Sequence, residues 1–240
     1  MGRLEVQDLS HSYGRTIRAL QGLSLTLRPG VTGVVGVNGA GKTTFIRVVS
    51  GGLRPTSGHV RVAGHDLYKR RERASALRSV AWMPQAAAYP KGMSVVEFVA
   101  YLTWLRGHSF KEANDRARAA LAGVRLEPVA EQKLGSLSGG MIRRMWLAQA
   151  LAAQSELLLL DEPSTGLDPK QRAVMVDLIR EQARRDGSIV VMSSHIVEDV
   201  IDLADHVVVL DRGRVLYDAG PPPNFDKDWL LSLLPDEEAQ

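Results

Sequence analysis

Apolar and polar residues alternate in the first third of the chain, which predicts strands that bury only one face. The alternation is clearest at residues 4–9 and returns at residues 22–27 and 58–64, where the residues Pro55 to Gly58 supply a turn before the last run. Alternation with a period of two is typical of a half-buried strand. The pattern therefore predicts an antiparallel β layer near the start of the chain.

Continuous apolar runs follow, and these predict strands covered on both faces. Such runs are typical of parallel sheets packed between helices. They occupy residues 31–35, 157–160, 189–192 and 207–210. The sequence Asp211-Arg212-Gly213-Arg214 after the last run predicts a hairpin turn. We therefore expect an α/β protein with a parallel core.

From about residue 90 to residue 153 the pattern becomes helical. Ser94 precedes Glu97 by three residues, and Ser109 precedes Glu112 by the same spacing. Both pairs match the capping box, in which the serine and glutamate side chains satisfy free N–H groups of the first helical turn. Helices are expected after each pair and over residues 141–153. After Pro221-Pro222-Pro223, the apolar residues of segment 229–234 are expected to cover the core.

A phosphate-binding loop is the first chemical motif. Residues 36–43 have the sequence Gly-Val-Asn-Gly-Ala-Gly-Lys-Thr and lie between the apolar run 31–35 and a helical stretch at 44–50. This is the strand, loop and helix context that the pattern G-x-x-x-x-G-K-[ST] requires. Backbone N–H groups of the loop and the helix N-terminus would surround a triphosphate. Lys42 would reach its β- and γ-phosphates, and Thr43 would offer a hydroxyl to Mg²⁺.

Two acidic residues end the most apolar of the strands. Asp161 and Glu162 follow residues 157–160. Asp161 is expected to hold Mg²⁺ through water. Glu162 is expected to orient or deprotonate the water that attacks the γ-phosphate, since phosphoryl transfer depends on positioning and on charge stabilisation.

A second motif, Leu137-Ser138-Gly139-Gly140, precedes the helix at 141–153. Together with the phosphate loop it makes the chain resemble the nucleotide-binding subunit of ABC transporters along nearly its whole length. The resemblance implies a P-loop NTPase (RecA-like) α/β core, an antiparallel β subdomain and an inserted α-helical subdomain at about residues 86–153. One domain is expected over residues 1–220, with a short tail at 221–240.

The resemblance also implies roles for single residues. Tyr13 would stack on adenine, Gln85 would touch Mg²⁺, and His195 would bond the γ-phosphate beside Glu162. The expected catalytic residues are Glu162, His195, Gln85 and Lys42, and the expected metal ligands are Thr43, Gln85 and Asp161. The expected ATP contacts are Tyr13, Gly36, Asn38, Gly39, Ala40, Gly41, Lys42, Thr43, Thr44, Ser138, Gly139, Gly140 and Asp168.

The resemblance further implies partners. Each ATP would lie between the phosphate loop of one subunit and Ser138–Gly140 of a second ABC ATPase subunit, in a homodimer or a heterodimer. Separate transmembrane permease subunits would dock in the cleft between the core and the helical subdomain, with residues 86–93 as the candidate surface. A soluble ABC ATPase that acts on nucleic acid, and an ABC ATPase that signals through a membrane partner without transport, remain alternatives.

The segment Leu137 to Met141 resembles the family's signature motif but departs from its commonest form, because Met141 stands where glutamine is usual. Met141 and the following Arg143-Arg144 resemble the branch that exports drugs, antibiotics and peptides. Hydrolysis is expected to survive, since Ser138 and the glycine N–H groups are retained.

Length and composition limit the number of domains and the kinds of partner that we expect. The 240 residues suffice for one large α/β domain, and the formal net charge of +3 is mild. The cluster Lys69-Arg70-Arg71 lacks interleaved aromatic residues, so no nucleic acid is expected as a partner. There is no cysteine, and no apolar run approaches the roughly 20 residues of a membrane helix. We expect a cytoplasmic protein that lies on the cytoplasmic face of the cell membrane through its permease.

Overall fold

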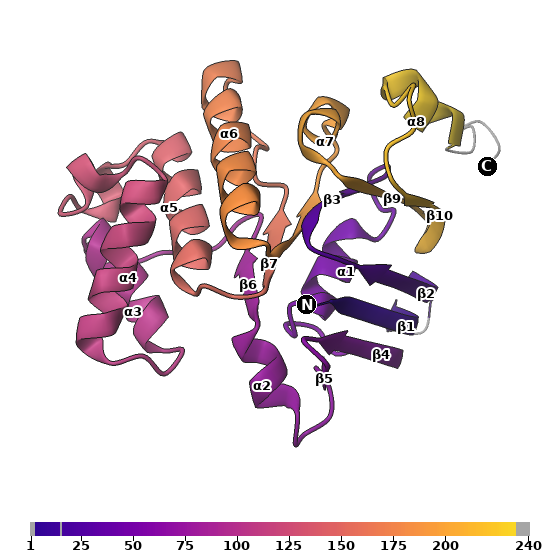
Figure 1. Ribbon diagram of the computed structural model, residues 1–240, viewed down its shortest axis with the longest axis horizontal. Coiled ribbons are helices and arrows are strands. Elements are labelled where there is room, and N and C mark those ends of the chain that lie inside the picture. Colours follow the sequence, from indigo (N-terminus) through magenta and orange to yellow (C-terminus); the bar gives the residue numbers. More distant parts are fainter. Residues whose placement is uncertain (1–2, 15, 234–240) are drawn as a thin grey trace.

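The computed structural model describes residues 3–14 and 16–233, and their strands form two sheets (Figure 1). The smaller sheet is antiparallel and has the order β2-β1-β4-β5. Its strands are β1 (Leu4–Tyr13), β2 (Ile17–Leu27), β4 (Ser57–Val62) and β5 (His65–Asp66). The predicted antiparallel layer is therefore confirmed.

The predictions for β1 and β2 were too short, because pairing continues where alternation stops. The register between the two strands shifts between Val6 and Leu9 and again between Leu9 and His11, yet the ladder runs on to the pair Tyr13 and Ile17. A bulge adds an unpaired residue and breaks the period of two without ending the strand.

The larger sheet has the order β10-β9-β3-β8-β7-β6 and is parallel except for β10. Its strands are β3 (Gly30–Val35), β6 (Val80–Met83), β7 (Leu157–Asp161), β8 (Ile189–Ser193), β9 (His206–Asp211) and β10 (Arg214–Ala219). Strands β9 and β10 form the predicted hairpin, with positive φ angles at Arg212 and Gly213. The short strand β6 was not predicted.

Alternate residues of the central strands point to opposite faces of this sheet and enter two different hydrophobic cores. Leu158 and Leu160 of β7 pack with the helices of the later part of the chain in one cluster, the main core cluster. Leu159 packs instead with the antiparallel sheet and α1 (Lys42–Val49). All residues of β7 and β8 are buried. This double burial explains why both strands are continuous apolar runs.

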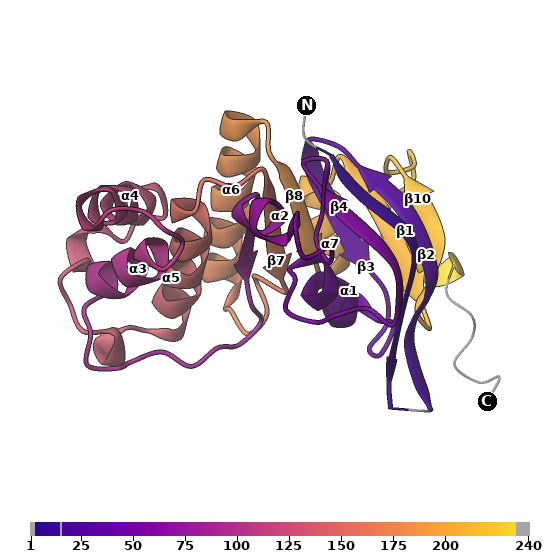
Figure 2. The same ribbon diagram turned by 90° about the horizontal axis from the view of Figure 1, so that it is seen from below.

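A group of helices lies at the end of the molecule opposite the antiparallel sheet (Figures 1 and 2). Its members are α3 (Val95–Trp104), α4 (Phe110–Gly123) and α5 (Gly139–Ala152), with short 3-10 turns at Glu127–Val129 and Leu134–Ser136. Phe98 of α3 meets Trp146 of α5 edge to face, with ring centroids 5.6 Å apart. The remaining helices are α2 (Arg73–Arg78), α6 (Pro169–Asp186), α7 (Val197–Leu203) and α8 (Lys227–Leu233).

One arginine ties this helical group to the edge of the core. Arg106, just beyond α3, donates through Nη2 to the carbonyl oxygens of Arg78 and Val80, both at 3.0 Å, and to Ser155 Oγ at 3.1 Å. Burial lowers the pKa of Arg106, and a buried guanidinium is stable only when its donors are satisfied in this way.

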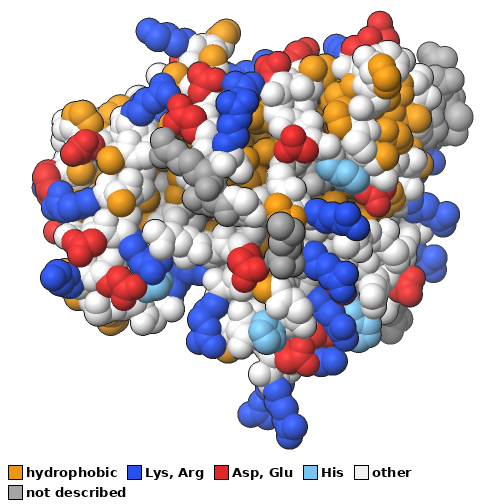
Figure 3. Space-filling view, in the orientation of Figure 1, with side chains coloured by type: hydrophobic (Ala, Val, Ile, Leu, Met, Phe, Trp, Pro, Cys, Tyr) orange, Lys and Arg blue, Asp and Glu red, His pale blue; other side chains and the backbone are white. Residues whose placement is uncertain are grey.

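The end of the described chain packs on the core, as the apolar pattern predicts. Trp229 lies edge to face with Tyr217 and Phe225, at 4.9 Å and 5.4 Å, and both Trp229 and Leu233 contact the main core cluster. Figure 3 shows hydrophobic side chains gathered over α8 and its neighbouring strands. Leu234 and the rest of the predicted tail, 234–240, lie outside the described residues, as do the side chains of Leu230 and Leu231.

Nowhere in residues 3–14 and 16–233 does a helix combine the length and the apolar character that a membrane span requires.

The two predicted capping boxes differ in the structure. The Ser94 hydroxyl accepts from Glu97 N at 3.3 Å and the Glu97 carboxylate accepts from Ser94 N at 2.8 Å, so this box is complete. At α4 the Ser109 hydroxyl accepts from Glu112 N, but the Glu112 carboxylate turns to His108 and Arg116 instead.

We expect Ser94→Ala to lower the free energy of unfolding by about 1–2 kcal/mol, because Ser94 is buried and its cap is reciprocal. Ser109→Ala should cost about 0.5–1 kcal/mol, because Ser109 is exposed. Urea denaturation of both variants measures the difference. An equal loss in the two variants would mean that the reciprocal bond adds nothing.

Candidate nucleotide-binding site

The loop of residues 36–43 joins β3 to α1 at the carboxyl end of the parallel sheet, as predicted. Two of its glycines are required by close backbone approaches. A Cβ at Gly36 would lie 2.2 Å from Leu210 O, and one at Gly41 would lie 2.5 Å from Ala19 O. Gly41 has a φ of 106° and no side chain with which to cap α1. The first N–H groups of α1 are therefore left for an anion.

Lys42 is buried within this loop, and its ammonium faces the acidic end of β7. Its Nζ donates to Gly36 O at 2.8 Å and to Val37 O at 3.0 Å. Burial lowers the pKa of Lys42, while the charges of Glu162 and Asp161 act in the opposite direction. The structure thus brings the lysine of the phosphate loop and the two predicted carboxylates together.

Thr43 and Asp161 lie side by side where a hard cation could bind. The Thr43 hydroxyl is 3.4 Å from Asp161 Oδ1, which also accepts from Ser193 Oγ at 2.8 Å. Burial raises the pKa of Asp161, against the opposing effect of its hydrogen bond to Ser193. A carboxylate and a hydroxyl, completed by phosphate and water oxygens, are the donor set that Mg²⁺ prefers. The residues present therefore fit this metal.

Glu162 is held in a left-handed backbone conformation, with φ of 48°. Its N–H donates to the buried hydroxyl of Ser193 at 3.0 Å. Its Oε2 accepts from Gln85 Nε2 at 2.8 Å and from Thr165 Oγ1 at 3.1 Å, and lies 3.4 Å from His195 Nδ1. Gln85 and His195, two residues singled out by the family resemblance, thus meet at the carboxylate of Glu162.

Sequence reasoning missed Ser193, which joins the two carboxylate residues. It is fully buried at the last position of β8, directly beside Asp161 in the strand register. A hydroxyl there can donate to one neighbour and accept from the other. A serine ending an apolar strand beside a strand that ends in Asp was the available signal.

The turn that leads from β8 to His195 is held by one backbone hydrogen bond and one side-chain hydrogen bond. Ser194 N donates to Val34 O of β3 at 3.1 Å, and Ser194 Oγ accepts from Ile196 N at 2.9 Å. These bonds hold the turn that carries His195 between β8 and α7, with 44% of its side chain exposed.

A second buried carboxylate beside the site was not predicted. Asp199 of α7 is 1% exposed and accepts from Ser164 Oγ and from Arg172 Nε. Ser164 follows Glu162, and Arg172 lies on α6 after Asp168. Asp199 therefore links the segment after Glu162, the start of α6 and the helix after His195.

Tyr13 lies at the end of β1 with 39% of its surface exposed. Its ring packs at 4.7 Å against His11, and its hydroxyl is 3.4 Å from Thr44 Oγ1 in the first turn of α1. An exposed aromatic face beside the phosphate loop is suited to stacking on a base.

Ser138 caps α5, accepting from Met141 N at 3.3 Å, and both Ser138 and Gly139 are exposed. The helix they begin lies well apart from α1 in both ribbon views (Figures 1 and 2). Gly139 instead borders a cleft of about 290 Å³ together with Gln85 and Thr165. Met141 packs against the main core cluster. The chain alone therefore does not bring its signature motif to its own phosphate loop.

Asp168 is exposed, and its carboxylate accepts from Gln171 N at 2.9 Å as the N-cap of α6. This contact is within its own helix, so the predicted role of Asp168 toward a nucleotide stays a prediction.

Fold and site together define a P-loop ATPase with a helical insertion. A profile of the family described as "ABC transporter" matches residues 20–165, more than half of the chain. The chain belongs to the ABC transporter family, and its domain is an ABC ATPase domain.

Relatives agree with this assignment. The chain is 36% identical over 214 residues to the daunorubicin/doxorubicin resistance ATP-binding protein DrrA of Streptomyces peucetius; the match covers 89% of this chain and 64% of DrrA. It is 33% identical over 240 residues to the energy-coupling factor transporter ATP-binding protein EcfA2 of Ligilactobacillus salivarius, covering 95% and 82% of the two chains. The chain therefore spans less than two thirds of DrrA.

The fold also matches a solved structure, the dimeric ATP-binding cassette MJ0796 in a post-hydrolysis state bound to ADP and Pi. The TM-score is 0.81 at 23% identity, over 90% of this chain and 98% of that one. The predicted α/β class with a P-loop NTPase core is thereby confirmed.

We expect Ser193→Ala to lower the free energy of unfolding by about 1–3 kcal/mol, because it leaves a buried N–H and a buried carboxylate short of a partner. Displacement of Glu162 should also lower kcat for ATP by roughly 10–100-fold. Thr103→Ala is the matched control, since the buried Thr103 hydroxyl donates to Val99 O at 2.8 Å within α3. A steady-state ATPase assay beside urea denaturation separates the two effects. Equal kcat in the two variants would show that Ser193 does not position Glu162.

Proposed function

We propose that this protein binds and hydrolyses ATP as the nucleotide-binding subunit of an ABC transporter, and that it powers a separate membrane permease. The observation that carries the proposal is the convergence of Gln85, Thr165 and His195 on the carboxylate of Glu162, one residue after Asp161. This arrangement suits a water-activating base next to a cation site.

In this proposal the loop N–H groups and Lys42 bind the β- and γ-phosphates, and Tyr13 stacks on the adenine. Thr43, Gln85 and Asp161 would hold Mg²⁺, which would neutralise phosphate charge. Glu162 orients and deprotonates the attacking water, and Gln85 and Thr165 fix the rotamer of its carboxylate. His195, whose Nδ1 lies 3.4 Å from Glu162 Oε2, would bond the γ-phosphate beside that carboxylate.

We propose that the active form is a dimer. Ser138 and Gly139 are exposed at the start of a helix with an available N-terminus, a group suited to binding a γ-phosphate. Because the chain holds them apart from its own phosphate loop, a second subunit must supply them. Asp168 is exposed at the start of α6, soon after Thr165 in the sequence, and would meet the partner subunit there.

We further propose that the permease exports a drug, an antibiotic or a peptide. Support comes from the name of the relative DrrA, a resistance protein, and from Met141 with Arg143-Arg144 after Gly140. The proposed place of the protein is the cytoplasmic face of the cell membrane.

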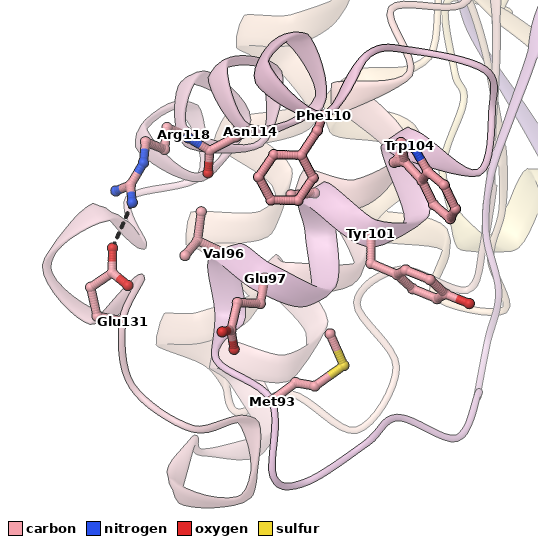
Figure 4. A pocket seen from close by; sticks show the side chains of 10 residues that line it. Met93, Val96, Glu97, Tyr101, Trp104, Phe110, Asn114, Arg118 and Glu131 are labelled. Carbon is pink, nitrogen blue, oxygen red and sulfur yellow. Dashed lines mark hydrogen bonds and ion pairs between the residues drawn. The ribbon is translucent and has the colours of Figure 1, made fainter.

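The proposed docking surface for the permease is a groove of about 570 Å³ on the helical group (Figure 4). Tyr101, Trp104 and Phe110 border it with 46%, 48% and 79% of their surfaces exposed. Figure 4 shows these rings around one opening, with Arg118 paired to Glu131 at the far end. Exposed aromatic groups of this kind mark protein contacts.

The groove modifies the expectation from sequence for residues 86–93. Pro90 is exposed, but Tyr89 and Met93 are half-buried against the main core cluster. Of these only Met93 borders the groove. The proposed surface therefore moves from the loop after Gln85 to α3 and the start of α4.

Glu162→Gln should lower kcat for ATP by roughly 10²–10⁴-fold, because the amide cannot act as a base. ATP binding should persist, since Lys42 and the loop are untouched. Size-exclusion chromatography with light scattering, with and without ATP and Mg²⁺, should show an ATP-dependent dimer. A monomer that still binds ATP would contradict the shared site.

The double change Tyr101→Ala/Phe110→Ala should reduce co-purification with the permease from solubilised membranes by about tenfold or more. Because both side chains are exposed, the free energy of unfolding should change by less than about 0.5 kcal/mol. The matched control is Ile201→Ala/Leu216→Ala, which removes exposed apolar groups from α7 and β10. Undiminished recovery of the permease would exclude the groove.

A further inference from the structure

The guanidinium of Arg143 lies between the two loops that carry Gln85 and Glu162. Arg143 is on the second turn of α5, the helix that begins at Ser138. Its Nη1 donates to Gln85 O at 2.5 Å, with Pro84 O at 3.5 Å. Its Nη2 donates to Glu162 O at 3.0 Å and to Thr165 O at 3.3 Å. One side chain thus joins three segments that are far apart in sequence.

Every one of these acceptors is a backbone carbonyl. Arg143 therefore fixes the paths of the two loops and does not bind their side chains. A planar guanidinium presents donors in two directions at once, which a lysine ammonium at a single point cannot reproduce. Burial lowers the pKa of Arg143, and the nearby charges of Glu162 and Asp161 oppose that effect.

The hydrogen bond from Arg143 to Glu162 O lies at a residue with a strained backbone conformation. The φ of 48° at Glu162 is unfavourable for a residue with a side chain, at a cost of about 1–3 kcal/mol. Ser193 holds the N–H of this residue, while Arg143 and the backbone N–H of Thr165 hold its C=O. The peptide groups on both sides of Glu162 are therefore anchored, one by the sheet and the other by α5.

We propose that Arg143 is a positioning residue, which sets Glu162 and Gln85 for hydrolysis and makes the signature helix α5 follow any displacement of their loops. The inference rests on the proposed function for its catalytic part. In this inference, Arg143 in the body of α5 supports the site of its own subunit. The first residues of the same helix bind the nucleotide of the partner subunit.

Arg144 provides a matched control on the same helix. It is also partly buried, and its Nη1 donates to Val124 O at 3.3 Å and Arg125 O at 3.2 Å, at the end of α4. Arg144→Met removes a buried arginine that binds backbone carbonyls away from the nucleotide site. It should destabilise the fold to a comparable degree without moving Glu162.

The experiment compares Arg143→Met, Arg143→Lys and Arg144→Met with the wild-type protein by hydrogen exchange and by ATPase kinetics. In the nucleotide-free protein, Arg143→Met should raise amide exchange at residues 85–87, 162 and 164–167, and Arg144→Met should not. With ATP, Arg143→Met should lower kcat by about 10–100-fold and leave KM within about threefold. Arg143→Lys should recover only a small part of the lost kcat.

Unchanged exchange in both loops, or a kcat for Arg143→Met no lower than that for Arg144→Met, would overturn the inference. A wild-type protein without ATPase activity would instead overturn the proposed function. The exchange experiment would then still decide whether Arg143 sets the two loops.

Discussion

A strand that is covered on both faces can present polar groups only where it ends, and the site depends on this constraint. Strands β7 and β8 are buried along their whole length and run parallel, so their carboxyl ends lie together. The phosphate loop leaves β3 at the same edge, on the other side of β8. Asp161, Ser193 and Lys42 consequently meet without any special folding of the loops that follow. The surrounding residues refine the orientation of groups that the sheet has already assembled.

Much of the fold and of the candidate site could be predicted from the sequence, because these parts depend on local sequence patterns. Continuous apolar runs predicted the parallel strands β3, β7, β8 and β9 but not β6, and the spacing between Ser94 and Glu97 predicted the start of α3. The phosphate loop and the acidic pair Asp161-Glu162 each have a strict local spacing, and the structure brings them together. The ends of β1 and β2 were missed because bulges break the alternation on which the prediction depended.

Other parts could not be predicted, because they depend on contacts between distant segments. Arg143 binds backbone carbonyls of residues 58 and 19 positions away, and a carbonyl has no signature in the sequence. Asp199 is an acidic residue on a short helix, and only the packing of α6 against α7 makes it a buried acceptor. The burial of Tyr89 and Met93 likewise follows from how their loop lies on the main core. Local pattern thus locates the residues of the candidate site, and tertiary packing decides what supports them.

The left-handed backbone at Glu162 has a consequence for how this chain can change. A glycine there would relieve the conformational strain, but it would remove the carboxylate that accepts from Gln85 and Thr165. If Glu162 activates water as proposed, relief of the backbone strain and turnover of ATP favour different residues at this position. In a pair where the partner subunit hydrolyses the ATP, this position could change to glycine during evolution. The chain would keep its sheet and its phosphate loop, and it would bind ATP without hydrolysing it.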